Sequence, residues 1–226
     1  MMDVVIFGLG PQSSLARYML TYDSPYRVIG FTVDEAYRTV DCFDGLLVAP
    51  FERVEEYFFP DKCRIFAPLG WKRMNRLRAE RVAQGKLKGY SFVSYISSRS
   101  LIWPDLETGD NGIILDGAIV ESSARIGDNC NLRSDCIISH RAVIDDHCFI
   151  GAQAVVSSSA VIGERCVLGL NSVVCDGIKV APGCFIGAGA VVTADTQENG
   201  VYVGTPAKRC LQPADQLREV SDLIVS

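Results

Sequence analysis

The sequence predicts a mainly β protein with an α/β N-terminal domain, in which a small parallel sheet precedes a parallel β-helix and a short C-terminal helix. Three observations support this prediction. Strand-like apolar runs alternate with helical stretches over residues 1–97, a six-residue repeat dominates residues 98–210, and apolar residues recur at helical spacing in residues 211–226. Alternating strands and helices are typical of parallel α/β sheets, whereas a fixed short period is typical of a solenoid.

The N-terminal 97 residues are expected to form a Rossmann-like domain. The predicted strands are residues 3–7, 27–33, 46–49 and 64–67, and residues 90–96 close the domain. The predicted helices are residues 15–20, 51–58 and 72–84. Strands separated by helices pair in parallel, so their carboxyl ends meet at one edge of the sheet.

A glycine-containing loop follows the first strand, with the sequence Gly8-Leu9-Gly10-Pro11-Gln12-Ser13. It reads Gly-x-Gly-x-x-Ser instead of the full dinucleotide fingerprint Gly-x-Gly-x-x-Gly, so a tight turn and a ligand-binding loop are equally good interpretations. Its position favours binding, because free N–H groups at the start of a helix attract anions. Lys72 and Arg73 lie after the fourth strand, where they could reach phosphates or begin a solvated helix.

An aliphatic residue occupies every sixth position between residues 114 and 192. The fourteen residues are Ile114, Val120, Ile126, Leu132, Ile138, Ile144, Ile150, Val156, Ile162, Leu168, Val174, Val180, Ile186 and Val192. The residue two positions before each is almost always small. Glycine often follows the aliphatic residue, and we expect it to relax the turn. Hexads of this kind predict short strands whose aliphatic side chains fill a prism.

Composition excludes several classes of protein. The net charge of −5 argues against nucleic-acid binding, and no apolar run reaches the length of a membrane span. Five of the nine cysteines occupy the small inward position of the repeat, namely Cys130, Cys136, Cys148, Cys166 and Cys184. We expect them to be buried and reduced. Together with the absence of a recognisable signal peptide, this predicts a cytoplasmic protein without membrane insertion.

The combination of these parts resembles the nucleotide-sugar N-acyltransferases of bacterial glycan pathways, in the left-handed β-helix acyltransferase superfamily. The resemblance rests on the N-terminal domain, the hexads, the segment Gly204-Thr205-Pro206-Ala207-Lys208 and the stretch 138–146 around His140. It implies a left-handed helix with three hexads per coil, hence about five coils. It also implies acetyl-CoA as co-substrate, a nucleotide-linked amino sugar as acceptor, and a homotrimer with its sites between subunits.

The resemblance also implies roles for individual residues. His140 matches the family's general base, and the backbone N–H of Ser158, one coil later, matches the oxyanion donor. The implied acetyl-CoA contacts are Phe149, Ser158, Leu170, Ala188 and Lys208. The implied contacts of the nucleotide sugar are Gly10, Pro11, Gln12, Ser13, Asp34 and Gly70. The chain departs from the family pattern at Arg141, where members carry an acidic residue beside the base.

Several alternatives stay open at this point. The acceptor could be a hydroxyl rather than an amine, and the β-helix could be a non-enzymatic scaffold. A zinc hydro-lyase similar to the gamma-type carbonic anhydrases needs three histidines per metal, whereas the chain has only His140 and His147. No metal is therefore expected, and His147 is predicted to be non-catalytic. The nucleotide, the sugar, the acylated position, the acyl chain length and the group that orients His140 are not predicted.

Overall fold

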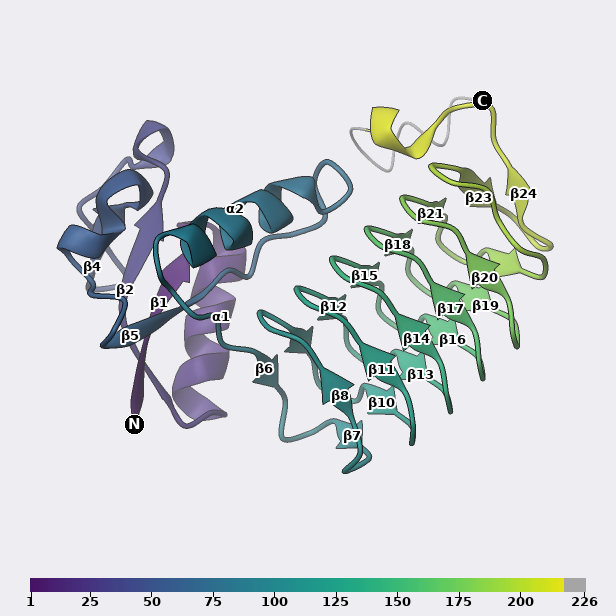
Figure 1. Ribbon diagram of the computed structural model, residues 1–226, viewed down its shortest axis with the longest axis horizontal. Helices are drawn as coiled ribbons and strands as arrows, with labels where there is room; N and C mark the ends of the chain where they lie inside the picture. Colours follow the sequence, from purple (N-terminus) through teal and green to yellow (C-terminus); the bar gives the residue numbers. More distant parts are fainter. Residues whose placement is uncertain (218–226) are drawn as a thin grey trace.

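A computed structural model describes residues 1–217 and shows two parts joined end to end (Figure 1). The N-terminal half is a five-stranded sheet in the order β3-β4-β2-β1-β5. Its strands are β1 (Met2–Phe7), β2 (Tyr26–Val33), β3 (Cys42–Phe43), β4 (Leu46–Pro50) and β5 (Cys63–Phe66). All neighbours pair in parallel except β3, which is antiparallel to β4. The four predicted strands are present, and β3 is an addition.

The helices of this half differ from the prediction in their bounds. α1 (Pro11–Tyr22) begins directly after the glycine loop, with Pro11 in its first turn. The predicted helix 51–58 is wrong, because Phe51–Glu56 is a 3₁₀ stretch interrupted at Arg53 by a non-helical backbone. A second 3₁₀ turn spans Glu35–Tyr37. α2 (Arg76–Leu87) starts four residues later than predicted because residues 73–75 have positive φ.

The segment after α2 belongs to both halves of the molecule. Phe92 forms an isolated parallel bridge with Ile65 of β5, whereas β6 (Tyr95–Ile96) pairs with β9 (Ile113–Ile114) of the β-helix. The chain therefore passes from one sheet into the other within a few residues. The predicted domain boundary at residue 97 falls directly after β6.

The β-helix has three faces of short parallel strands. Face 1 consists of β7 (Leu101–Ile102), β10 (Ile119–Val120), β13 (Ile137–Ile138), β16 (Val155–Val156), β19 (Val173–Val174) and β22 (Val191–Val192). Face 2 consists of β8 (Glu107–Thr108), β11 (Arg125–Ile126), β14 (Val143–Ile144), β17 (Val161–Ile162) and β20 (Lys179–Val180). Face 3 consists of β6, β9, β12 (Asn131–Leu132), β15 (Phe149–Ile150), β18 (Val167–Leu168), β21 (Phe185–Ile186), β23 (Val201–Val203) and β24 (Lys208–Arg209).

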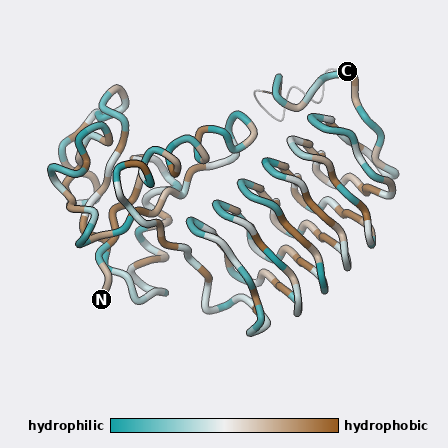
Figure 2. The backbone as a smooth tube through the Cα atoms, in the orientation of Figure 1, coloured by the Kyte–Doolittle hydropathy of each residue, from teal (hydrophilic) through white to brown (hydrophobic). Residues whose placement is uncertain are grey.

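The predicted register of the repeat is confirmed. Paired residues such as Ile119 and Ile137 lie eighteen positions apart, so three hexads make one coil. All fourteen aliphatic residues of the series are buried in one core, and Figure 2 shows hydrophobic stretches recurring along the coils. The five inward cysteines are buried in the same core.

The glycines of the repeat have a different role from the predicted one. The positive φ angles in the turns belong mostly to other residues, such as Arg141 (60°) and His147 (62°). Gly169, which follows an inward leucine, is needed for another reason: a Cβ there would lie 2.5 Å from the backbone nitrogen of Ala188. Close approach of successive coils, rather than turn conformation, therefore requires glycine at this position.

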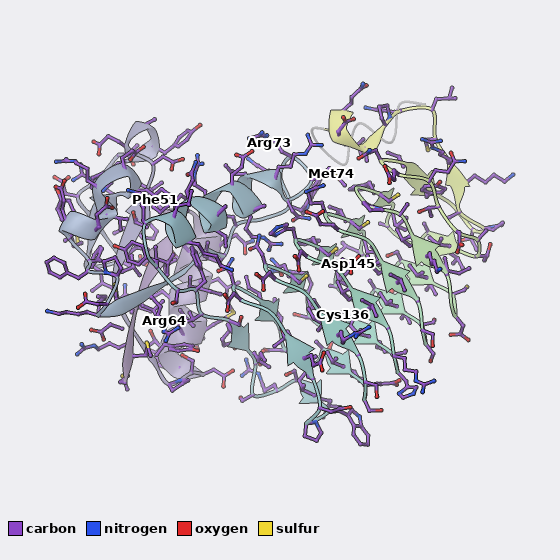
Figure 3. All side chains as sticks on the ribbon, viewed as in Figure 1. Phe51, Arg64, Arg73, Met74, Cys136 and Asp145 are labelled. Carbon is purple, nitrogen blue, oxygen red and sulfur yellow. The ribbon has the colours of Figure 1, made fainter. Side chains whose placement is uncertain are left out.

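The C-terminal segment returns to face 3. β24 pairs antiparallel with β23, and a single 3₁₀ turn (Ala214–Gln216) replaces the predicted start of a helix. Leu217 joins an apolar cluster with Met74, Val167 and Phe185. Figure 3 shows Met74 beside the coils of the β-helix, near the start of α2. The rest of the predicted C-terminal helix, residues 218–226, lies outside the described residues.

Candidate active site

His140 lies in the turn between β13 of face 1 and β14 of face 2, with its side chain exposed. Its Nδ1 lies 2.8 Å from the carbonyl oxygen of Ser122, one coil earlier, and 3.0 Å from the hydroxyl of the same residue. A carbonyl only accepts hydrogen bonds, so Nδ1 donates and Nε2 keeps its lone pair. The backbone N–H of His140 donates to the Glu121 carboxylate at 2.7 Å. The imidazole is thus held in the tautomer that a general base needs.

His147 lies at the next corner, between β14 and β15, and has the opposite tautomer. Its Nδ1 lies 3.0 Å from the side-chain nitrogen of Asn129, which can only donate. Nδ1 therefore accepts, and Nε2 carries the proton. Burial lowers the pKa of His147 below its ordinary value, which favours this neutral form. In this state His147 has no free basic nitrogen.

Ser158 stacks on the coil above His140, as the repeat predicted. The next residue, Ser159, donates its N–H to the His140 carbonyl at 3.0 Å, and Gly177 donates to the Ser158 carbonyl at 3.0 Å. Among residues 1–217, the N–H of Ser158 itself donates to no protein acceptor. A donor without a protein partner, one coil from a histidine, is a suitable arrangement for an oxyanion site.

Apart from Ser158, the residues predicted to contact acetyl-CoA lie in other parts of the β-helix. Leu170 and Ala188 are exposed and stacked at the corner between faces 3 and 1. Lys208 is exposed on β24. Phe149 lies on face 3, where it packs against the apolar cluster that contains Trp71 and Met74. The structure does not bring these residues to His140 within one chain. The His140 corner and the Leu170 corner instead border the two opposite edges of face 1.

Most residues predicted to contact the nucleotide sugar lie together. Gly10, Pro11, Gln12, Ser13 and Gly70 line one cavity of about 600 Å³ at the N-terminal end of α1, which Tyr37 and Lys72 also line. Tyr37 was not predicted; its position three residues after Asp34, past the end of the second strand, is the signal that could have identified it.

Asp34 lies apart from this cavity. Its carboxylate accepts from Nη2 and Nε of Arg81 at 2.7 and 3.1 Å. It lines an adjoining cavity of about 650 Å³, which shares Tyr37 with the first. The Asp34 carboxylate is thus already paired with a guanidinium within the protein.

Comparisons with known proteins agree with this fold. A family model for the bacterial transferase hexapeptide matches residues 123–158, and a model for the hexapeptide repeat of succinyl-transferase matches residues 159–194. Residues 123–194 therefore consist of hexapeptide repeats. Its fold is a Rossmann-like domain followed by a left-handed β-helix, as the sequence predicted. A search of curated protein sequences found no match.

Several solved structures share the complete architecture. The acetyltransferase domain of PglB from Neisseria gonorrhoeae superposes with a TM-score of 0.83 at 20% identity, covering 93% of this chain and 100% of that one. WeeI from Acinetobacter baumannii gives 0.79 at 18%, covering 93% and 100%. A variant of perosamine N-acetyltransferase from Caulobacter crescentus, in complex with CoA and GDP-perosamine, gives 0.79 at 20%, covering 94% and 98%. The shared fold thus extends over both halves of the chain.

The described residues offer neither a metal cluster nor a membrane-spanning helix. Within the described part of the chain, no group of three or more histidine, cysteine, aspartate and glutamate side chains is placed to hold a metal ion. None of the helices described in residues 1–217 combines the length and apolar character that a membrane crossing requires.

Proposed function

We propose that the protein is an acetyl-CoA-dependent N-acetyltransferase that acts on a nucleotide-linked amino sugar, with His140 as general base. The observation that carries this proposal is the hydrogen bond from His140 Nδ1 to the Ser122 carbonyl, which leaves Nε2 basic at an exposed corner. Structures with the same architecture support the choice of substrates, since one PglB domain binds acetyl coenzyme A and perosamine N-acetyltransferase binds GDP-perosamine.

In the proposed reaction, Nε2 of His140 accepts a proton as the sugar amine attacks the thioester carbonyl. The tetrahedral oxyanion forms beside the N–H of Ser158, which donates a hydrogen bond to it. Collapse of this intermediate breaks the C–S bond and gives the amide. The proton on Nε2 then passes to the departing CoA thiolate, so His140 returns to its neutral state.

The sugar nucleotide would bind in the cavity at the start of α1. Gly10, Pro11, Gln12 and Ser13 offer backbone at a helix N-terminus, and Lys72 adds a positive charge for a diphosphate. Asp34 would act indirectly, by fixing Arg81 at the wall of the adjoining cavity. Phe149, Leu170, Ala188 and Lys208 would contact acetyl-CoA.

The complete site would form between subunits of a homotrimer. Face 1 is bordered by the His140 corner on one edge and by the Leu170 corner on the other. Its outward residues are all aliphatic: Leu101, Ile119, Ile137, Val155, Val173 and Val191. Association through this face would place the base of one subunit near the acetyl-CoA contacts of its neighbour. We place the enzyme in the cytoplasm, where its nine free thiols remain reduced.

The direct test is a coupled assay with the purified protein. UDP-, dTDP- and GDP-linked amino sugars are incubated with acetyl-CoA, and release of free CoA thiol is followed. Mass spectrometry then assigns the acetyl group to nitrogen or oxygen. Transfer to an amine supports the proposal, transfer to a hydroxyl identifies a sugar O-acetyltransferase, and no transfer to any of these sugars contradicts the proposed enzyme.

A further inference from the structure

Helix α2 joins the two halves of the molecule through a fully buried arginine. Arg78 donates from Nη1 to the Leu69 carbonyl at 3.3 Å in the N-terminal half. It donates from Nη2 to the Cys148 carbonyl of the β-helix at 3.2 Å and to the Asn75 side chain at 3.4 Å. No carboxylate in the described part of the chain pairs with it, and its Nε has no hydrogen-bond partner there. A single side chain therefore links the Leu69 loop to a β-helix corner.

A ladder of amides makes a second link between the same two regions. The backbone N–H of Ala67 donates to the side-chain oxygen of Asn111 at 2.9 Å, and the Asn111 side-chain nitrogen donates back to the Ala67 carbonyl at 3.2 Å. That nitrogen also donates to Asn129 at 2.6 Å, and Asn129 donates to His147 at 3.0 Å. Because a backbone N–H only donates, the contact with Ala67 fixes the direction of every later bond.

Both links end on one loop, residues 67–70, and this loop is a wall of the cavity at the start of α1. Pro68, Leu69 and Gly70 line that cavity. Ala67 is held by Asn111 and Leu69 by Arg78, so two of the four loop residues are attached to the β-helix that carries His140. The position of the wall relative to the base is set by these contacts rather than by the N-terminal sheet alone.

We propose that Arg78 and the ladder Asn111–Asn129–His147 are positioning residues for the nucleotide sugar. They hold the loop 67–70 in its binding conformation and fix its place relative to His140. This inference rests on the proposed function, and it assigns His147 a role in substrate affinity instead of proton transfer.

A purely stabilising role accounts poorly for Arg78. Burial disfavours the charged guanidinium and lowers the pKa of Arg78 to about 10. Replacing a buried ion pair by apolar residues of similar volume is often neutral or stabilising, whereas a buried carbonyl that loses its donor costs free energy. In Arg78→Met, the removal of a buried charge without a carboxylate partner offsets the loss of the donor to Leu69 and Cys148, so its Tm should stay close to that of wild type. Loss of ligand affinity without loss of stability is a result that a stabilising role does not produce.

The test measures binding to the intact protein. UDP, dTDP and GDP are titrated by calorimetry into wild type, and the diphosphate that binds is used for the variants. Arg78→Met and Asn111→Asp should each weaken binding of this diphosphate roughly 10-fold, the net worth of one to two hydrogen bonds.

In Asn111→Asp, the introduced carboxylate would keep the bond from the Ala67 N–H but could no longer donate to Ala67 or Asn129. The Kd for acetyl-CoA should stay unchanged. In kinetics, KM for the sugar nucleotide should rise while kcat stays within a few-fold.

The matched control is Asn199→Asp. Asn199 is an exposed asparagine that shares the positive φ of Asn111, and it lies at the other end of the corner that precedes face 3. This variant should bind the diphosphate like wild type. Wild-type affinity in folded Arg78→Met and Asn111→Asp would overturn the inference while leaving the proposed function intact. Failure of wild type to bind any of the three diphosphates would overturn the nucleotide site, and the inference with it.

Discussion

At the scale of single residues, the two histidines are distinguished by their hydrogen bonds. His140 Nδ1 faces a carbonyl and His147 Nδ1 faces an amide N–H, so only His140 has an available basic nitrogen. His140→Ala should lower kcat by roughly 10²–10⁴-fold, the usual contribution of a positioned base. KM for acetyl-CoA should change little. Steady-state kinetics, with circular dichroism as folding control, measures this; full activity in the folded variant would exclude His140 as the base.

The depressed pKa of His147 predicts a pH dependence of stability. The folded protein holds His147 neutral, whereas the unfolded chain takes up a proton near pH 6.5. Its contribution is present above that pH and is lost as the pH falls through the folded value. His147→Gln, which accepts the Asn129 bond but does not titrate, should therefore lose less Tm than wild type between pH 7 and pH 5. Identical Tm profiles for the two proteins would contradict this prediction.

The resemblance favoured His140 over His147 and left open what orients its imidazole. The family pattern pointed to a neighbour in the chain, and that position is Arg141. The orienting group is the Ser122 carbonyl, eighteen residues earlier, and backbone groups leave no mark in a sequence. The coil length alone places residue 122 beside residue 140, so the spacing was the available signal. The pairing of Asp34 was missed for a similar reason, because its partner Arg81 lies on another element.

At the scale of elements, the hexads were predictable because their period reports a burial pattern directly. The reactivity of the inward cysteines tests this burial pattern. Burial raises the pKa of Cys136 to about 12, and Cys148 is likewise raised well above its ordinary value. Thiolate, the reactive form, is thus scarce, so a thiol reagent should label Cys42 rapidly in the native protein and the buried cysteines only after unfolding. Mass-spectrometric mapping after brief labelling measures this, and rapid modification of Cys136 would contradict the register.

The bounds of α2 and the 3₁₀ stretch after β4 were less predictable, because neither has a periodic pattern. Residues 73–75 adopt positive φ, with Met74 packed on face 3 and Asn75 hydrogen-bonded to the Cys166 carbonyl. The β-helix therefore decides where α2 begins. A partner about ninety residues away cannot be recognised from local propensity.

At the scale of the whole molecule, the remaining prediction is the homotrimer. Face 1 presents aliphatic residues along its six strands, whereas the corresponding positions of face 2 include Glu107, Arg125 and Lys179. An apolar face of this kind needs a partner, and subunits joined by it would bring the His140 corner to the Leu170 corner. The sequence predicted the trimer through resemblance, and the structure adds which face is apolar.

Two matched substitutions test this assembly. Val155 and Val161 occupy the same position of successive hexads, on face 1 and on face 2. Light scattering of wild type should give three times the chain mass of 24.7 kDa. Val155→Asp should shift the protein toward monomer, because a carboxylate would be buried in an apolar contact. It should also lose activity while keeping its far-UV spectrum, since each site needs two subunits. Val161→Asp should remain trimeric and active.

A monomeric wild type, or a trimeric and fully active Val155→Asp, would mean that face 1 is not the interface and that one chain forms the site alone.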